Sequence, residues 1–253
     1  MFARVVSWLR SEPSPVVLDP ALLEETNAKL EKATSEERLR WAWETFGKRA
    51  AIGTSFQPAG VAILHLAKVN KLRLPAFSLD TGLLFRETIE LKSALQDHLN
   101  IRIESLLPDL SLTEQAKVHG DKLWEKNPDL CCELRKVQPL NRKLRSLDLW
   151  ITGVRRDQSA QRTLTPILEL AWREDGSIVW KLNPLADWNR DRVWKYLREN
   201  QLPYNALHDR GYRSIGCSVC TRPTSASDDD RAGRWPGLAK TECGLHTRYK
   251  NSA

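Results

Sequence analysis

The sequence predicts an α/β fold: an open, mainly parallel twisted sheet flanked by helices and followed by a C-terminal loop and tail. Two observations support this fold class. Short apolar runs alternate with helical apolar patterns between residues 34 and 104, which implies parallel strands joined by right-handed crossovers. From residue 211 to residue 237, Gly, Pro, Ser and Asp dominate. We therefore divide the chain into an N-terminal extension (1–33), an α/β domain (34–210) and a C-terminal segment (211–253).

Helix and strand signals alternate through the first part of the domain. Thr34 and Glu37 have the spacing of a capping box, and apolar residues at helical spacing follow them. Short apolar runs are then predicted to be strands, with helices between them. The predicted strands are residues 50–52, 74–79 and 101–104, and the predicted helices lie near residues 61–67 and 85–98.

Further elements are predicted in the second part of the domain. Residues 149–152 form a fourth predicted strand, and Asp175-Gly176 marks a hairpin turn. Helices are expected to start at Cys131 and continue through Leu144, and to span residues 187–200. The stretch 211–237 is expected to be a long ordered loop or lid, and not a separate domain.

The 253 residues include 39 Lys and Arg against 32 Asp and Glu, which gives a formal net charge of +7. This charge suits an anionic small molecule, and by itself it would also suit nucleic acid. No apolar run approaches the roughly 20 residues that span a bilayer, and Pro13 and Pro15 interrupt the N-terminal segment. We expect a soluble, cytoplasmic protein without a targeting segment.

Three predicted strands end in loops suited to binding an anion. In open α/β sheets, ligands bind beyond the carboxyl ends of the strands, where helix N-termini and paired arginines hold phosphate or sulfate. Taken singly, each loop could consist of ordinary turn residues, whereas the three together favour a nucleotide-like anion. The candidate binding residues are Ser55, Phe56 and Gln57, then Asp80, Thr81 and Gly82, and finally Gly153, Arg155, Arg156 and Gln158.

Four of the five cysteines form two close pairs. Cys217 and Cys220 have the C-x-x-C spacing of iron–sulfur and zinc ligands, and Cys131 and Cys132 are adjacent. Adjacent helical residues point about 100° apart, which is awkward for one tetrahedral ion but suits two corners of a cubane cluster. An iron–sulfur cluster, a four-cysteine zinc site and buried structural thiols all remain compatible with the spacing.

The fifth cysteine, Cys243, stands alone near the C-terminus, after Pro236 and Gly237. Lys240 and His246 lie near it in sequence and would favour the thiolate, the form of the thiol that attacks an electrophile. The pattern is typical of a reactive thiol on a movable tail, although an incidental surface cysteine would look the same.

Together these residues resemble the adenylyl-sulfate/phosphoadenylyl-sulfate reductase family. The resemblance covers roughly residues 35 to 247, and the combination of its motifs is highly specific. It includes the loop Thr54-Ser55-Phe56-Gln57 and the terminal motif Glu242-Cys243-Gly244-Leu245-His246. The other stretches that carry it are residues 79–82, 153–159, 184–188, 193–197, 202–205, 207–209, 211–212 and 214–217.

The resemblance implies a fold of the PP-loop, adenine nucleotide α-hydrolase-like type and a set of residue roles. Cys243 would be the nucleophile, and Lys136 lies one helical turn after Cys132, so that it can face both a cluster and a substrate sulfate. Cluster-bearing members typically use adenosine 5′-phosphosulfate. The implied ligands of a [4Fe-4S] cluster are Cys131, Cys132, Cys217 and Cys220, and the implied catalytic basic residues are Lys136, Arg231, Arg234 and His246.

The activity that the resemblance implies is the assimilatory, thioredoxin-dependent reduction of adenosine 5′-phosphosulfate to sulfite and AMP through an enzyme S-sulfocysteine. No thioredoxin-like domain follows Cys243 in the sequence, so a separate thioredoxin or glutaredoxin is expected as reductant. Neither a nucleic acid nor a membrane is expected as a partner, and a homo-oligomer is compatible with the sequence.

One departure and three alternatives bear on this activity. The loop from Gln57 to Gly60 lacks the acidic residue that many relatives carry, so the resemblance does not fix its adenosine contacts. The chain could prefer phosphoadenylyl sulfate or accept both substrates. A zinc-bearing nucleotide-binding module and an ATP pyrophosphatase are further alternatives, but the first loop lacks the Ser-Gly-Gly-x-Asp-Ser phosphate grip of the latter. Cys243 within its terminal motif separates the reductases from both.

Overall fold

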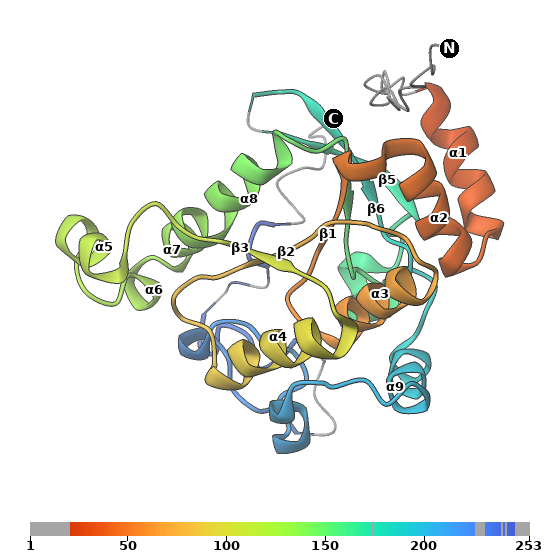
Figure 1. Cartoon of the computed structure of the whole chain (residues 1–253). Helices are drawn as coiled ribbons and strands as arrows, with labels where there is room; N and C mark the ends of the chain where they lie inside the picture. Colours follow the sequence, from red (N-terminus) through yellow and green to blue (C-terminus); the bar gives the residue numbers. More distant parts are fainter. Residues whose placement is uncertain (1–20, 174, 226–230, 239, 241, 246–253) are drawn as a thin grey trace, which may run out of the picture.

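The computed structural model describes residues 21–173, 175–225, 231–238, 240 and 242–245. A six-stranded sheet with the order β3-β2-β1-β4-β6-β5 runs through them (Figure 1). Neighbouring strands pair in parallel except β5 and β6, which pair antiparallel, so the predicted open, mainly parallel sheet is confirmed. The strands are β1 (Ala50–Gly53), β2 (Ala76–Leu79), β3 (Ile103–Leu106), β4 (Leu149–Ile151), β5 (Leu168–Trp172) and β6 (Ile178–Leu182).

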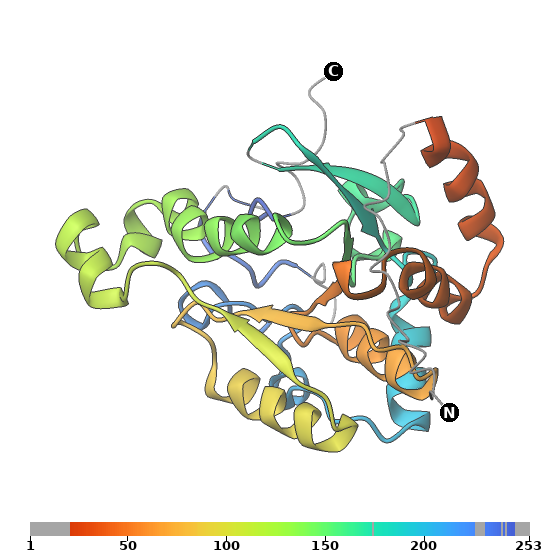
Figure 2. The same ribbon diagram turned by 45° about the horizontal axis from the view of Figure 1, so that its top comes forward.

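Helices cover both faces of the sheet, as Figure 2 shows. Ala50 and Ile52 of β1 point into the larger core on one face, and Ala51 points into the smaller core on the other. Within the described residues, no helix has the length and apolar character needed to cross a bilayer. The larger core is covered by α2 (Ser35–Phe46), α3 (Pro58–Val69), α4 (Arg86–Leu99) and α9 (Arg190–Glu199), and the smaller by α8 (Gln138–Leu144).

Two local predictions are confirmed by hydrogen bonds and strand pairing. The Thr34 hydroxyl accepts from the Glu37 N–H at 3.2 Å, and the Glu37 carboxylate accepts from the Thr34 N–H at 2.7 Å, which completes the capping box of α2. The predicted hairpin at Asp175-Gly176 joins β5 to β6, and Gly176 takes the positive φ of 77° that its turn requires.

The helix expected to start at Cys131 differs in its beginning and in its regularity. It starts three residues earlier, as α7 (Pro128–Cys132), and continues as a π-helical turn (Glu133–Val137) before α8. Asn127 caps α7 by accepting from the Leu130 N–H at 3.0 Å. Pro139 has no N–H and could not donate to the carbonyl four residues before it in a regular α-helix. The wider π-helical turn before Pro139 therefore loses no hydrogen bond at this position. The two cysteines therefore lie at the end of a helical turn and not at its start.

The second half of the predicted N-terminal extension forms α1 (Ala21–Lys32). This helix packs beside β5, where the Asn27 side chain accepts from the Leu168 N–H at 2.8 Å. Arg38 of α2 is 1% exposed and joins α1 to the chain before α9, because it donates to the carbonyls of Leu30 and Pro184, each at 2.9 Å. Residues 21–32 thus contribute to the layered structure, while residues 1–20 lie outside the described part.

Two short helices and the C-terminal segment complete the described chain. α5 (Leu112–His119) and α6 (Leu123–Lys126) project beside α7, to the left in Figure 1. The described parts of the segment expected to be a loop or lid lie against the loop that follows β2. The Ser218 N–H donates to the Leu83 carbonyl at 2.8 Å, and the Trp235 N–H donates to the Cys220 carbonyl at 3.0 Å. These bonds fix the second cysteine pair near the carboxyl edge of the sheet.

Candidate active site

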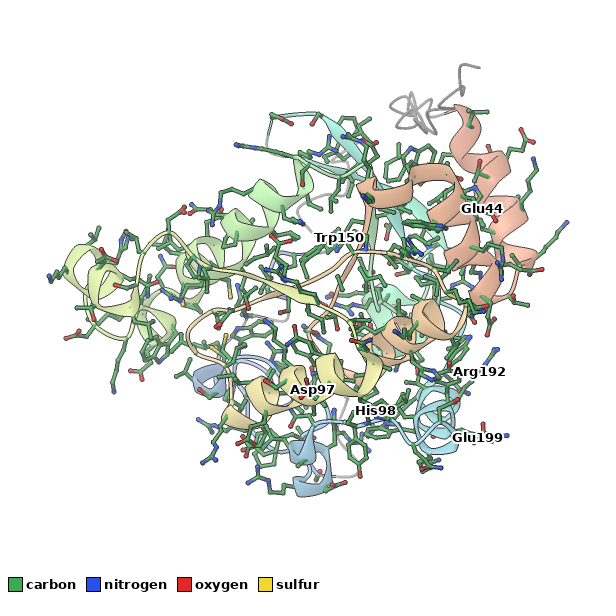
Figure 3. The ribbon with its side chains drawn as sticks, viewed as in Figure 1. Glu44, Asp97, His98, Trp150, Arg192 and Glu199 are labelled. Atoms are coloured by element: carbon green, nitrogen blue, oxygen red, sulfur yellow. The ribbon has the colours of Figure 1, made fainter. Side chains whose placement is uncertain are left out.

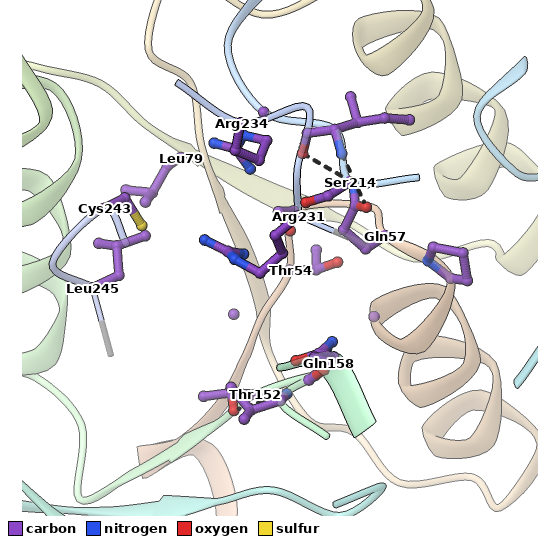
Figure 4. A pocket seen from close by; sticks show the side chains of 18 of the residues that line it. Thr54, Gln57, Leu79, Thr152, Gln158, Ser214, Arg231, Arg234, Cys243 and Leu245 are labelled. Carbon is purple, nitrogen blue, oxygen red and sulfur yellow. Dashed lines mark hydrogen bonds between the residues drawn. The ribbon is translucent and has the colours of Figure 1, made fainter. Parts of the chain in front are cut away.

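The loops after β1, β2 and β4 surround one cavity of about 240 Å³ at the carboxyl edge of the sheet. Trp150 of β4, near the middle of the molecule in Figure 3, lines it together with Phe77, Leu79 and Leu140. The cavity therefore combines apolar surface with the polar groups of all three loops. Figure 4 labels Thr54 and Gln57 from the first loop, and Thr152 and Gln158 from the third. The polar lining residues from these loops include Thr54, Ser55, Gln57, Thr81, Thr152, Gly153, Arg155 and Gln158.

Two glycines allow the loops to approach each other beside the cavity. A Cβ atom on Gly60 would meet the Thr54 hydroxyl oxygen at 2.5 Å, and one on Gly153 would lie 3.2 Å from the Gly60 nitrogen. These contacts place the N-terminus of α3 against the loop after β4. Because the first N–H groups of a helix have no intrahelical partners and carry partial positive charge, this arrangement suits an anion.

The predicted residues of the first loop take different places. Ser55 and Gln57 line the cavity, and the Gln57 amide donates to the Ile215 carbonyl at 3.1 Å and accepts from the Ile215 N–H at 3.3 Å (Figure 4). Phe56 is 3% exposed and packs in the larger core, with a φ of 59° that is uncommon outside glycine. Its N–H donates to the Thr54 hydroxyl at 3.0 Å, so Phe56 stabilises the loop from the core side and does not line the cavity.

The second loop forms a tight turn that contacts the cysteine region. The Asp80 carboxylate accepts from the Gly82 N–H at 3.0 Å, and Gly82 has a φ of 68°. The Thr81 hydroxyl lies 3.3 Å from the sulfur of Cys217. Of these three predicted binding residues, only Thr81 lines the cavity, while Asp80 and Gly82 hold the turn.

The predicted residues of the third loop divide in the same way. Arg155 and Gln158 line the cavity, and Arg155 also pairs with Asp157 at 2.9 Å. Arg156 pairs with Glu31 at 2.6 Å and donates to the Thr165 carbonyl at 2.8 Å. Arg156 therefore ties the loop to α1 and does not line the cavity.

The two cysteine pairs of the sequence, Cys131-Cys132 and Cys217/Cys220, lie together in a buried group beside the cavity. All are free thiols with 5–7% exposure, and Cys132, Cys217 and Cys220 pack around Trp235. Burial raises the pKa of the Cys131 thiol to about 12 and that of the Cys220 thiol to about 11. Within the described residues, no group of three or more His, Cys, Asp or Glu side chains is placed to hold a single metal ion.

Lys136 is a buried cation between these thiols and the cavity. It is 8% exposed, lines the cavity and lies 4.0 Å from the Cys132 sulfur. Burial lowers the pKa of Lys136, but the electrostatic interaction with Cys217, Cys132 and Cys243 raises it by more, so its pKa lies above the ordinary value. No carboxylate of the described residues forms an ion pair with it. The groups of opposite sign that can compensate its charge are therefore cysteine sulfurs in their thiolate form.

The C-terminal tail brings Cys243 to the same cavity (Figure 4). Glu242, which precedes it, accepts from Arg162 at 2.9 and 3.1 Å and from Arg231 at 3.0 Å. On the other side of the thiol, Leu245 lines the cavity and packs against the smaller core. The residues on both sides of Cys243 are thus held inside the site.

Arg231 and Arg234 both line the cavity, and both guanidiniums lie over the ring of Trp235. The Arg234 guanidinium lies 4.5 Å and that of Arg231 5.7 Å from the centre of the Trp235 ring. A Cβ atom on Gly216 would come within 2.2 Å of the Arg234 guanidinium, so a larger residue there would displace this guanidinium. The Nε atom of Arg234 is buried and makes no hydrogen bond within the described residues.

The structure thus brings Cys243, Lys136, Arg231 and Arg234 to one cavity, while His246 lies outside the described residues. Sequence reasoning missed Arg162 and gave Glu242 no role. Arg162 follows Gln158 by four residues, which would have placed it near the third loop had a helical turn been expected there. Its pairing with Glu242 spans 80 positions, and no local pattern signals such a contact.

This combination of fold and site has a counterpart among known proteins. The sequence matches the phosphoadenosine phosphosulfate reductase domain over residues 49–223, and the chain belongs to this family of sulfur-directed oxidoreductases. It is 48% identical over 222 residues to the adenosine 5′-phosphosulfate reductase of Salinibacter ruber, with 87% of each chain covered. It is 45% identical over 210 residues to adenosine 5′-phosphosulfate reductase 2 of Bacillus subtilis, covering 82% of this chain and 87% of that protein. The predicted family membership is confirmed.

Solved structures agree with the fold. The phosphoadenylyl-sulfate reductase of Candida auris, crystallised as a phosphate complex, superposes with a TM-score of 0.72 at 32% identity. The alignment covers 83% of this chain and 100% of that one. The FMN adenylyltransferase of Candida glabrata superposes with a TM-score of 0.54 at 11% identity, over 90% of this chain and 78% of that one. This second likeness concerns the fold alone.

The burial of the thiols predicts the order in which they react. At pH 8, iodoacetamide should modify Cys243 before the other four cysteines, because Cys243 is half-buried whereas they are 5–7% exposed. Peptide mapping by mass spectrometry after a short exposure to the reagent measures this order. Under the same exposure, a Cys243→Ser variant should remain unmodified. Modification of the Cys131-Cys132 pair ahead of Cys243 would contradict the placement of the tail.

Proposed function

We propose that this protein reduces adenosine 5′-phosphosulfate to sulfite and AMP in sulfate assimilation, with Cys243 as the nucleophile. One observation carries the proposal: Cys243 lines the same cavity as Lys136, Arg231, Arg234 and the three loops at the carboxyl edge of the sheet. A nucleotide cavity alone would fit many enzymes of this fold. A thiol inside it, among cations, fits the transfer of a sulfo group.

The lining of the cavity suits the two halves of such a substrate. Phe77, Leu79 and Trp150 offer apolar surface for an adenosine. The N-terminus of α3 offers backbone N–H groups for a phosphate. Lys136 and Arg234 offer positive charge for sulfate oxygens, which would otherwise repel an incoming thiolate.

The first chemical step is a displacement at the sulfate sulfur. The Cys243 thiolate attacks this sulfur, and the bond from it to the oxygen shared with phosphorus breaks. The electron pair of that bond leaves with AMP, and Cys243 becomes an S-sulfocysteine. Lys136 and Arg234 stabilise the charge on the sulfate oxygens as the thiolate approaches.

The second step requires a separate dithiol, for which a thioredoxin or a glutaredoxin is suited. One of its thiolates attacks the Cys243 sulfur, so that sulfite leaves with the electron pair of the S–S bond. The second thiol of the reductant then resolves the mixed disulfide and restores the Cys243 thiolate. Two electrons pass from the dithiol to the sulfo group, and the reductant becomes a disulfide.

A [4Fe-4S] cluster held by Cys131, Cys132, Cys217 and Cys220 also belongs to the proposal. The thiols of this set are buried and not joined by disulfides. Beside them, the Lys136 ammonium is buried without a carboxylate, and such a charge is costly unless negative partners compensate it. Protonated structural thiols would not compensate it, whereas cluster-bound thiolates would. Each thiolate of such a cluster binds a different iron, so a single-ion arrangement is not required.

When bound, the cluster supplies a fixed charge distribution next to the cation that faces the substrate. The chain's own residues hold this arrangement. The Thr81 hydroxyl contacts the Cys217 sulfur at 3.3 Å, and Lys136 contacts the Cys132 sulfur at 4.0 Å while lining the cavity. Electron transfer is assigned to the thiols, since thiol exchange moves electrons in pairs.

The contacts of two arginines favour adenosine 5′-phosphosulfate over its 3′-phosphorylated form. Arg155 and Arg156 would be the first candidates to hold an additional phosphate. Arg155 is paired with Asp157, and Arg156 with Glu31. A phosphate would have to displace a carboxylate at either position.

The proposed first step predicts a covalent intermediate in the absence of reductant. Wild-type protein mixed with adenosine 5′-phosphosulfate alone should release about one AMP per active site, and the Cys243 peptide should gain the mass of SO₃. Adding a thioredoxin should then release sulfite. Cys243→Ser should keep its iron but lose activity by about 10³-fold or more, because a hydroxyl is a weak nucleophile at neutral pH. An adduct on another cysteine would refute the role of Cys243.

The proposed cluster predicts the metal content of the purified protein. Wild-type protein should contain about four iron and four sulfide per chain, and Cys220→Ser should lose most of both, because thiolate ligation holds the cluster. Colorimetric iron and acid-labile sulfide assays measure this directly, independently of activity. Cys243→Ser is the matched control and should retain both. Wild-type protein with about one zinc and no sulfide would support the four-cysteine zinc site instead.

The ion pairs of Arg155 and Arg156 with carboxylates predict the substrate preference. The kcat/KM for adenosine 5′-phosphosulfate should exceed that for the 3′-phosphorylated form by at least about tenfold, which corresponds to about 1.4 kcal/mol. Initial rates of sulfite release with both nucleotides under identical conditions give the ratio. A ratio below one would mean that this protein is a phosphoadenylyl-sulfate reductase.

A further inference from the structure

We propose that Glu242 is the positioning residue for Cys243: its ion pairs with Arg162 and Arg231 fix the thiol in the cavity during the attack on sulfur. This inference rests on the proposed function of Cys243 as nucleophile. It assigns the carboxylate a role in the sulfo-transfer step and not in substrate binding.

The contacts of Glu242 are direct and well protected from water. One guanidinium nitrogen of Arg162 donates to both carboxylate oxygens, at 2.9 and 3.1 Å, and Arg231 donates to one of them at 3.0 Å. The exposure of the three side chains is 11%, 12% and 19% for Glu242, Arg162 and Arg231. Ion pairs buried to this degree are screened little by salt and hold their geometry better than exposed pairs.

The pair also connects the tail to the substrate loop. The Gln158 amide donates to the Gly153 carbonyl at 3.3 Å and accepts from the Arg155 N–H at 3.1 Å. The same Gln158 oxygen accepts from Arg162, which in turn holds Glu242. Cys243 is therefore positioned against the loop after β4, whose residues line the cavity where the substrate is proposed to bind.

The local backbone explains why such an anchor is needed. The described part of the chain from residue 236 to residue 245 forms no helix or strand, and Gly237 and Gly244 both take positive φ. A segment without regular hydrogen bonding has conformational freedom that must be lost before the thiol is held in one position. Because displacement at sulfur requires aligned atoms, a shift of about 1 Å in the thiol can cost about 100-fold in rate.

The charge of Glu242 argues against a role in holding the substrate. A carboxylate repels an anionic substrate, so its place beside the nucleophile needs another reason. Glu242 is neutralised by two guanidiniums, which leaves Lys136 and Arg234 to face the sulfate. If Glu242 merely occupied the anion site until substrate displaced it, its removal would tighten substrate binding and would not slow the chemical step.

The experiment separates chemistry from binding. For Glu242→Ala, the rate of AMP release in a single turnover at saturating adenosine 5′-phosphosulfate should fall by about 100-fold. The Kd for AMP, measured by equilibrium dialysis, should stay within about threefold. Glu242→Gln keeps an acceptor for both arginines and should recover most of the lost rate. Glu90→Ala, which removes an exposed pair with Arg86, should match the wild type.

A double-mutant cycle tests the partner. Arg162→Ala combined with Glu242→Ala should be no slower than the slower single variant, because both remove the same interaction. An unchanged single-turnover rate in Glu242→Ala, tighter AMP binding, or additive losses in the cycle would each overturn the proposal. If Glu242→Ala does not fold, as judged by circular dichroism and iron content, Glu242→Asp replaces it: this variant keeps the charge but shortens the reach to both arginines, so the single-turnover rate should fall while the Kd for AMP stays within about threefold. Failure of the proposed function would be seen separately, as a wild-type protein without a Cys243 adduct.

Discussion

The parallel pairing of β4 with β1, and of β1 with β2, determines where chemistry can occur in this protein. Parallel strands end on the same side of a sheet, so the loops after all three strands meet at one edge. Gly60 and Gly153 then allow the first and third loops to touch. The cavity, the cysteine region and the tail all lie at this edge. If one strand changed register, its loop would no longer meet the other loops there.

A buried positive charge links the two halves of the site. Lys136 belongs to the π-helical turn between α7 and α8. It lines the cavity and also contacts the Cys132 sulfur. Thr81 forms a second link, because it lines the cavity and contacts the Cys217 sulfur. The sulfur-rich region is thus part of the wall of the candidate active site, and its electrostatics act on the same cavity as Cys243.

Periodicity and turn chemistry predicted much of this protein, because these signals are local. The capping box at Thr34, the hairpin at Gly176 and the loops after the strands follow from residues close together in sequence. The burial of Phe56 beneath its loop and the commitment of Arg156 to Glu31 did not follow, since each depends on distant partners. For the same reason the ion pair of Arg162 with Glu242 could not be predicted from the sequence and is seen only in the structure. The family resemblance implied roles for the cysteines, which spacing alone left open.

The position of α1 beside β5 has a consequence for how the molecule behaves at high concentration. β5 is an outermost strand, and such strands present unpaired backbone groups to which other chains can add. Asn27 and Glu31 of α1 accept from the N–H groups of Leu168 and Ile167, at 2.8 and 3.3 Å. A truncation that removes α1 would leave this edge bare, and the shortened protein would be prone to aggregate through strand pairing.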